Sequence, residues 1–108
     1  MFACKTAPKI EGFDSKLWKD DPKGCKNQRA KLFPLLEKNQ NKLIKVESSQ
    51  IMKLLGHPDK KELYKRNQRY YVYFVQSGGQ CQDTKGNYGK ILRIRFDALQ
   101  RVSEIVFN

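Results

Sequence analysis

The sequence predicts one α+β domain, a two-layer sandwich in which two helices pack on a three- or four-stranded antiparallel sheet. The chain has 108 residues, which is enough for one hydrophobic core and too few for a second independent one. Helical periodicity precedes residue 56, and strand-like patterns follow residue 58. Because the order is helix, helix, strand, strand, strand, we expect both helices on one face of a β-meander, with residues 14–108 forming the single domain.

The first half of the chain predicts helical structure. Asp14 and Ser15 can cap a short turn that contains Trp18. From residue 25 to residue 36, a mostly apolar set recurs near every third or fourth position, which indicates a helix: Cys25, Arg29, Leu32, Phe33 and Leu36. Pro34 lies inside this pattern, and because proline lacks an amide donor we expect the helix to kink or restart there.

A second helix is indicated between residues 48 and 56. Ser48 or Ser49 can accept a hydrogen bond from the free amides of its first turn. Gly56 followed by Pro58 should end it, because glycine adopts the left-handed conformation of a helix terminus and proline cannot continue the helix. The helix is short, so packing must stabilise it.

The second half of the chain predicts strands. Residues 69–75 are rich in aromatic and β-branched side chains, and residues 90–96 alternate between apolar and charged ones. Residues 102–107 form the last expected strand after a tight connection. Residues 60–65 are mostly charged, and the sequence leaves them open as a strand or a turn.

The charge of the chain favours acidic partners. There are 22 Lys and Arg against 11 Asp and Glu, a net charge of +11. Such a surface attracts nucleic acid, anionic lipid headgroups or an acidic protein face. The charge is spread evenly over both halves of the chain, so a solvated basic surface without a dedicated site is the alternative interpretation.

The three cysteines suggest an exported protein. Cys4 follows Met1, Phe2 and Ala3, and this run resembles the end of a bacterial lipoprotein signal, in which the cysteine becomes lipidated. Residues 1–13 would then be a signal remnant and tether. Cys25 and Cys81 would remain as an even pair for a disulfide in an oxidising periplasm. The alternative is a cytoplasmic protein with three ordinary thiols.

A family resemblance covers about residues 46–108. The helix that ends in Leu54-Leu55-Gly56-His57-Pro58, the aromatic strand, and the strand that ends in Phe96-Asp97 together resemble the SmpA/OmlA (BamE-like) outer-membrane lipoproteins. The family turn usually carries glycine before the last strand, where this chain has Gln100. The resemblance implies an α-α-β-β-β sandwich, a lipid anchor on Cys4, and a scaffold role in outer-membrane protein assembly or envelope integrity.

The sequence carries little that predicts catalysis. His57 is the only histidine, and its place between Gly56 and Pro58 indicates a turn. A nucleophile elbow, a phosphate-binding loop and a dinucleotide fingerprint are missing from the sequence, as is a paired-cysteine metal motif. We therefore expect a protein that is not an enzyme and that uses no metal and no cofactor.

A candidate binding face lies on the sheet. If the alternating apolar side chains of the strand at residues 90–96 face the helices, Arg93 and Arg95 point outward. Tyr71 and Tyr73 can then lie on the same outer face as these arginines. Tyr and Arg are common in protein interfaces. The alternatives are ordinary cross-strand pairs, or an RNA- or single-stranded-nucleic-acid-binding face.

The expected function is that of a monomeric binding or scaffold module anchored at the outer membrane and facing the periplasm. Its expected partner is an envelope protein or an anionic membrane surface. The sequence does not identify which of these it meets.

Overall fold

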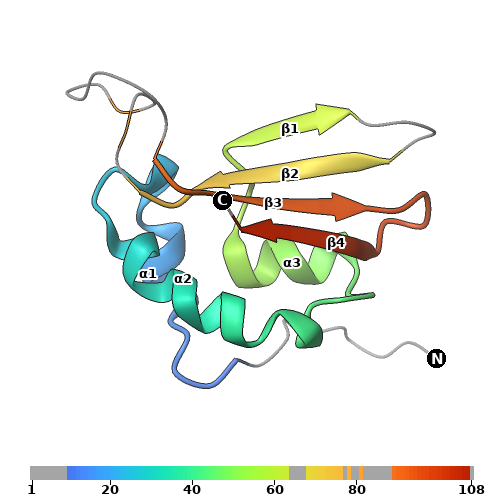
Figure 1. Cartoon of the computed structure of the whole chain (residues 1–108), viewed down its shortest axis with the longest axis horizontal. Helices are drawn as coiled ribbons and strands as arrows, with labels where there is room; N and C mark the ends of the chain where they lie inside the picture. Colours follow the sequence, from blue (N-terminus) through green and yellow to red (C-terminus); the bar gives the residue numbers. More distant parts are fainter. Residues whose placement is uncertain (1–9, 64–67, 77, 79–80, 82–88, 108) are drawn as a thin grey trace.

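The computed structural model describes residues 10–63, 68–76, 78, 81 and 89–107. In this part of the chain, three α-helices lie against an open, four-stranded antiparallel sheet (Figure 1), which confirms the α+β class. The short turn expected near Trp18 is a helix of its own. The segment after residue 59, which the sequence left open as a strand or a turn, begins with a strand, so the sheet has four strands.

The helical layer contains three α-helices and two short 3-10 turns. Their bounds are α1 Ser15–Lys19, η1 Pro22–Gly24, α2 Gln28–Lys38, η2 Gln40–Lys42 and α3 Ser48–Leu55. Asp14 caps α1, because its carboxylate accepts hydrogen bonds from the amides of Lys16 and Leu17 at 3.0 and 3.2 Å.

Two details of the helices differ from the sequence prediction. α2 continues as one helix through the exposed Pro34, so the predicted restart at this residue does not occur. The N-cap of α3 is Glu47, one residue before the predicted serines, and it forms a reciprocal capping box with Gln50. α3 ends at Gly56, as predicted, with a positive φ of 77° but a ψ of −169°, which lies outside the left-handed helical region.

The strands follow one another in space as they do in the sequence. Their bounds are β1 Lys60–Leu63, β2 Arg69–Phe74, β3 Ile91–Phe96 and β4 Val102–Phe107. The register pairs Tyr71 with Ile94 and Tyr73 with Leu92. These side chains therefore share one face of the sheet, and they belong to the core beneath the helices.

The core is built from both layers. It is formed by buried side chains of the three helices, the connecting segments and the three longer strands, namely Ile10, Trp18, Leu32, Phe33, Leu36, Leu43, Ile51, Leu54, Leu55, Tyr71, Tyr73, Val75, Leu92, Ile94, Phe96 and Val102. Ile10 is only 6% exposed, and Phe13 lies 5.8 Å from the Trp18 ring. The assignment of residues 10–13 to a tether was therefore wrong, because this segment packs on the domain.

The turn between β3 and β4 contains Gln100 in the left-handed region, with a φ of 65°. The carboxylate of Asp97 organises this turn by accepting hydrogen bonds from the amides of Leu99 and Arg101 at 2.9 and 3.0 Å. Gln100 thus adopts a backbone conformation that glycine adopts more easily, at a cost in backbone strain.

Gly24 marks a close approach between the helical layer and the sheet. A Cβ atom there would lie 2.5 Å from the carbonyl carbon of Val75 and 2.6 Å from the carbonyl oxygen of Phe74. Its φ is also positive, at 68°. Backbone meets backbone at this point, so only glycine allows η1 to sit against the end of β2.

We expect Gly24→Ala to destabilise the domain strongly, because the added methyl would force η1 away from β2. Gly12→Ala is the matched control: it has a φ of 81°, but its nearest neighbour would be a Leu35 methyl at 3.8 Å. The control should cost about 1 to 2 kcal/mol from strain alone. Urea denaturation of both variants measures the difference, and equal costs would contradict the close approach.

Candidate functional site

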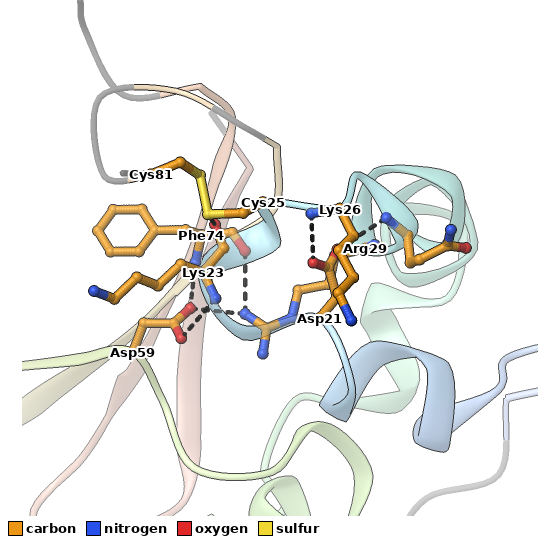
Figure 2. The surroundings of a disulfide bond; sticks show 9 residues. Asp21, Lys23, Cys25, Lys26, Arg29, Asp59, Phe74 and Cys81 are labelled. Atoms are coloured by element: carbon orange, nitrogen blue, oxygen red, sulfur yellow. Dashed lines mark hydrogen bonds and ion pairs between the residues drawn. A yellow bond between two sulfur atoms is a disulfide. The ribbon is translucent and has the colours of Figure 1, made fainter. Parts of the chain in front are cut away.

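Asp21 begins a buried polar network at the corner where helices α1 and α2 meet the end of β2. Its side chain is fully buried. Its two oxygens accept hydrogen bonds from the amides of Lys26, Gln28 and Arg29 at 2.7, 2.8 and 3.1 Å (Figure 2). Asn27, the residue before α2, makes no side-chain cap. Asp21 therefore caps α2 from a distance, and its charge suits the positive end of the helix dipole.

Arg29 lies at the centre of the network and is 2% exposed. Its Nε donates to the Trp18 carbonyl at 2.8 Å, and its Nη1 donates to the Asp59 carboxylate at 2.7 Å and to the Phe74 carbonyl at 3.1 Å. The guanidinium carbon lies 5.1 Å from the Trp18 ring centre and 5.9 Å from that of Tyr73. One planar cation thus joins α1, α2 and β2 to the segment before β1.

Asp59 completes the network from the other side. One of its oxygens accepts from the amide of Lys23 at 3.1 Å, and the other accepts from Arg29 and from the amide of Phe74 at 2.8 Å (Figure 2). The buried carboxylate of Asp21 and the mostly buried one of Asp59 therefore have hydrogen-bond partners at each oxygen. These hydrogen bonds offset the cost of removing the two charges from water.

The disulfide lies next to this network. Cys25 follows η1 directly, and its sulfur lies 1.97 Å from that of Cys81, with the two Cα atoms 5.8 Å apart (Figure 2). The pair that the cysteine count predicted is therefore brought together as a disulfide. It joins the start of the α2 region to the segment after β2, across 56 residues of sequence.

Tyr73 contributes a neutral hydroxyl to the same corner. Burial raises the pKa of Tyr73 far above its ordinary value, so the phenol stays protonated. The hydroxyl donates to the Gly56 carbonyl at 2.9 Å and ties β2 to the end of α3. His57, one residue further on, is exposed. In the described part of the chain no group of three His, Cys, Asp or Glu side chains is placed to hold a metal ion.

The structure corrects the predicted binding face. Tyr71 is 4% exposed and Tyr73 is fully buried, because both face the helices together with Leu92 and Ile94. The prediction that they share a side with Arg93 and Arg95 was therefore wrong. Two of the rings that the nucleic-acid alternative would use for stacking therefore lie in the core, whereas Tyr70 lies beside Arg93 on the outer face.

Arg93 and Arg95 do lie on the outer face of the sheet, where they form cross-strand pairs. Arg93 is hydrogen-bonded to Glu62 and lies over the Tyr70 ring at 5.2 Å. Arg95 bonds to Glu104 at 3.1 Å. The hydrogen bond from Arg93 holds the pKa of Glu62 below its ordinary value, against an opposing effect of partial burial. These pairs match the alternative interpretation of ordinary cross-strand contacts.

Sequence reasoning missed the network of Asp21, Arg29 and Asp59. One signal was present, because Arg29 occupies a position in the apolar stripe of α2 together with Leu32 and Leu36. A cation on the buried face of a helix indicates an acidic partner elsewhere in the chain. The predicted lipidation site, Cys4, lies outside the described residues.

Comparison with protein-family models, with curated proteins and with solved structures found no match to this chain. The resemblance to the SmpA/OmlA family therefore stays a prediction. Among the described residues, no helix combines the length and the apolar character that crossing a bilayer requires.

The disulfide should contribute about 4 kcal/mol to the free energy of unfolding, because it closes a long loop in the unfolded chain. We expect the double variant Cys25→Ser/Cys81→Ser to melt at a lower temperature than the native protein under oxidising conditions. Reductant should lower the melting temperature of the native protein and leave the double variant unchanged. A native melting temperature that does not respond to reductant would disprove the bond in solution.

The ion pair between Arg29 and Asp59 should show strong coupling. Arg29→Met leaves a buried carboxylate without its cation and should cost about 3 to 5 kcal/mol. We expect Arg29→Met/Asp59→Asn to cost much less than the sum of the two single variants, as measured by chemical denaturation. The exposed pair Arg95 and Glu104 serves as the control, with Arg95→Met and Glu104→Gln coupled by at most about 1 kcal/mol. Additive costs at the buried pair would contradict the network.

Proposed function

We propose that this chain is a non-enzymatic binding domain of the bacterial envelope, lipid-anchored through Cys4 at the outer membrane, whose helical layer rests on an anionic lipid surface. The distribution of ion pairs carries this proposal. Among the described residues, the exposed ion pairs lie on the sheet and its last turn, and their basic members are Lys60, Arg93, Arg95 and Arg101.

The helical layer differs because many of its lysines have no carboxylate partner among the described residues. These exposed lysines come from the three helices and their connections, namely Lys16, Lys19, Lys26, Lys31, Lys38, Lys42 and Lys45. Lysine is a compact, strongly hydrated charge on a flexible stem, which suits attraction to many lipid headgroups better than a single fixed contact. Leu17 and Ile44, exposed by 43% and 38%, add apolar contacts on the same layer.

The chemistry-bearing residues support a binding role. Cys25 and Cys81 are joined, so neither is a free thiolate nucleophile, and the buried carboxylates have hydrogen-bond partners at each oxygen. A disulfide also suits an oxidising compartment such as the periplasm. The scaffold role implied by the family resemblance agrees with a rigid, basic domain that stays close to the membrane.

We expect the full chain, prepared without lipid, to sediment with phosphatidylglycerol vesicles and not with phosphatidylcholine vesicles. Binding should weaken steeply as salt rises from about 0.05 to 0.5 M, because the Debye length shortens. Lys31→Glu/Lys38→Glu, which reverses two charges on one face of α2, should reduce binding by about tenfold or more.

The matched control is Lys60→Glu/Arg101→Glu, which makes the same change in net charge on the sheet and its last turn. Equal losses in both double variants would show that only the total charge matters and would contradict the role of the helical layer. The anchor is tested separately by the intact mass of the native protein extracted from membranes. A Cys4 without lipid would remove that part of the proposal.

A further inference from the structure

A cavity of about 440 Å³ opens beside the buried network, where the end of α1 meets the end of α3. This volume lies within the range of sites that hold small ligands. Its lining includes the apolar residues Pro22, Leu55 and Pro58, together with the nitrogen-bearing residues Lys19, Arg29 and His57. The residues used in the predicted binding face of the sheet do not line it.

Arg29 presents one nitrogen that the fold does not use. Its Nε and Nη1 are bonded as described above, but its Nη2 has no hydrogen-bond partner among the described residues. Nη2 is also not fully enclosed by protein. In Figure 2 this terminal nitrogen points away from Asp59 and from the disulfide. Because Arg29 lines the cavity and its other nitrogens are occupied, Nη2 is the donor that it offers there.

The guanidinium is held ready for a ligand. It lies beside the rings of Trp18 and Tyr73, and its bonds to Trp18, Asp59 and Phe74 fix its plane. A ligand would therefore meet a donor that is already ordered, and little side-chain entropy would be lost on binding.

The charge of the cavity favours an anion. Lys19 and Arg29 are cations, and Asp59 is the single anion of the lining. The oxygens of Asp59 already accept bonds from two amides and from Arg29, so its charge is largely compensated. Lys19 is exposed and has no carboxylate partner among the described residues, so its ammonium group can approach a ligand at the rim.

We propose that this cavity binds a carboxylate carried on a small apolar body, with Arg29 Nη2 as the fixed donor and Lys19 as the cation at the rim. An arginine N–H suits a carboxylate oxygen, and the apolar walls suit a hydrocarbon or aromatic group. Such a carboxylate is supplied either by a free organic acid or by the C-terminal residue of a peptide. The proposal concerns a concave site and does not depend on the membrane-binding proposal for the helical layer.

The test is a titration of the isotope-labelled full chain, followed by two-dimensional NMR at low salt. Hexanoate probes a free acid, N-acetylphenylalanine probes a peptide C-terminus, and hexanamide and N-acetylphenylalaninamide are their uncharged counterparts. We expect at least one acid to shift the backbone amides of Lys19, Gly56 and His57 with about millimolar affinity. The amides should bind at least about fivefold more weakly, because they lack the charge.

Lys19→Glu keeps the buried network intact and should weaken binding of that acid by about fivefold. Lys16→Glu is the matched control, because it makes the same change on the same helix at a residue that does not line the cavity. The control should stay within about twofold of the native affinity. Tighter binding of hexanoate would indicate a free acid as the ligand, and tighter binding of N-acetylphenylalanine would indicate a peptide C-terminus. Either result supports the site.

Four results would overturn the proposal. These are the absence of shifts with both acids, equal affinity for an acid and its amide, equal losses in the two lysine variants, and tighter binding of inorganic phosphate than of either acid. Circular dichroism of Lys19→Glu confirms that a loss of binding is not a loss of folding.

Discussion

The buried guanidinium of Arg29 is the interaction on which the corner of this domain depends. It joins the end of α1, the start of α2, the end of β2 and the segment before β1 through three hydrogen bonds of 2.7 to 3.1 Å. A buried cation is costly unless it is paired and its hydrogen bonds are made. Asp59, two carbonyls and two aromatic rings meet this demand, so the residues around Arg29 must hold their positions for the charge to be tolerated.

Two further constraints act at the same corner. Gly24 allows backbone to approach backbone, and the disulfide from the adjacent Cys25 holds the segment after β2 beside it. The polar network needs this closeness, because Phe74 contributes both its amide and its carbonyl to it. The disulfide, the glycine and the ion pair therefore act on the same corner, whereas the opposite end of the sheet is organised by the local turn at Asp97.

The sequence predicted the parts of the fold that local chemistry decides. The capping of α1 by Asp14, the end of α3 at Gly56 and the three longer strands follow from residue type and spacing, and the disulfide follows from the cysteine count. The face of β2 could not be predicted, because its residues are aromatic or β-branched without a polar alternation. Tyr71, Val72, Tyr73 and Phe74 are all at most 5% exposed, so both faces of this strand are covered.

The candidate site escaped prediction for a different reason. Arg29 meets Asp59 and Phe74 across 30 and 45 residues of sequence, and no local pattern specifies such pairings. The same is true of the cavity, which is formed by segments from α1, η1, α2 and the end of α3. The sequence does place Arg29 in the apolar stripe of α2. That signal indicates one partner of a buried ion pair, but it does not identify Asp59 as the other.

The placement of charge separates a structural role from a binding role in this domain. On the sheet, Arg93 and Arg95 are matched by Glu62 and Glu104, so their positive charge is largely used within the protein. Lys16, Lys19, Lys26, Lys31, Lys38, Lys42 and Lys45, on the helical layer, have no such match among the described residues, and their field extends into solvent. Arg29 stands between these cases, because two of its nitrogens stabilise the fold and the third is available beside a cavity. A lysine could not divide its charge in this way, since only a planar guanidinium offers donors in several fixed directions.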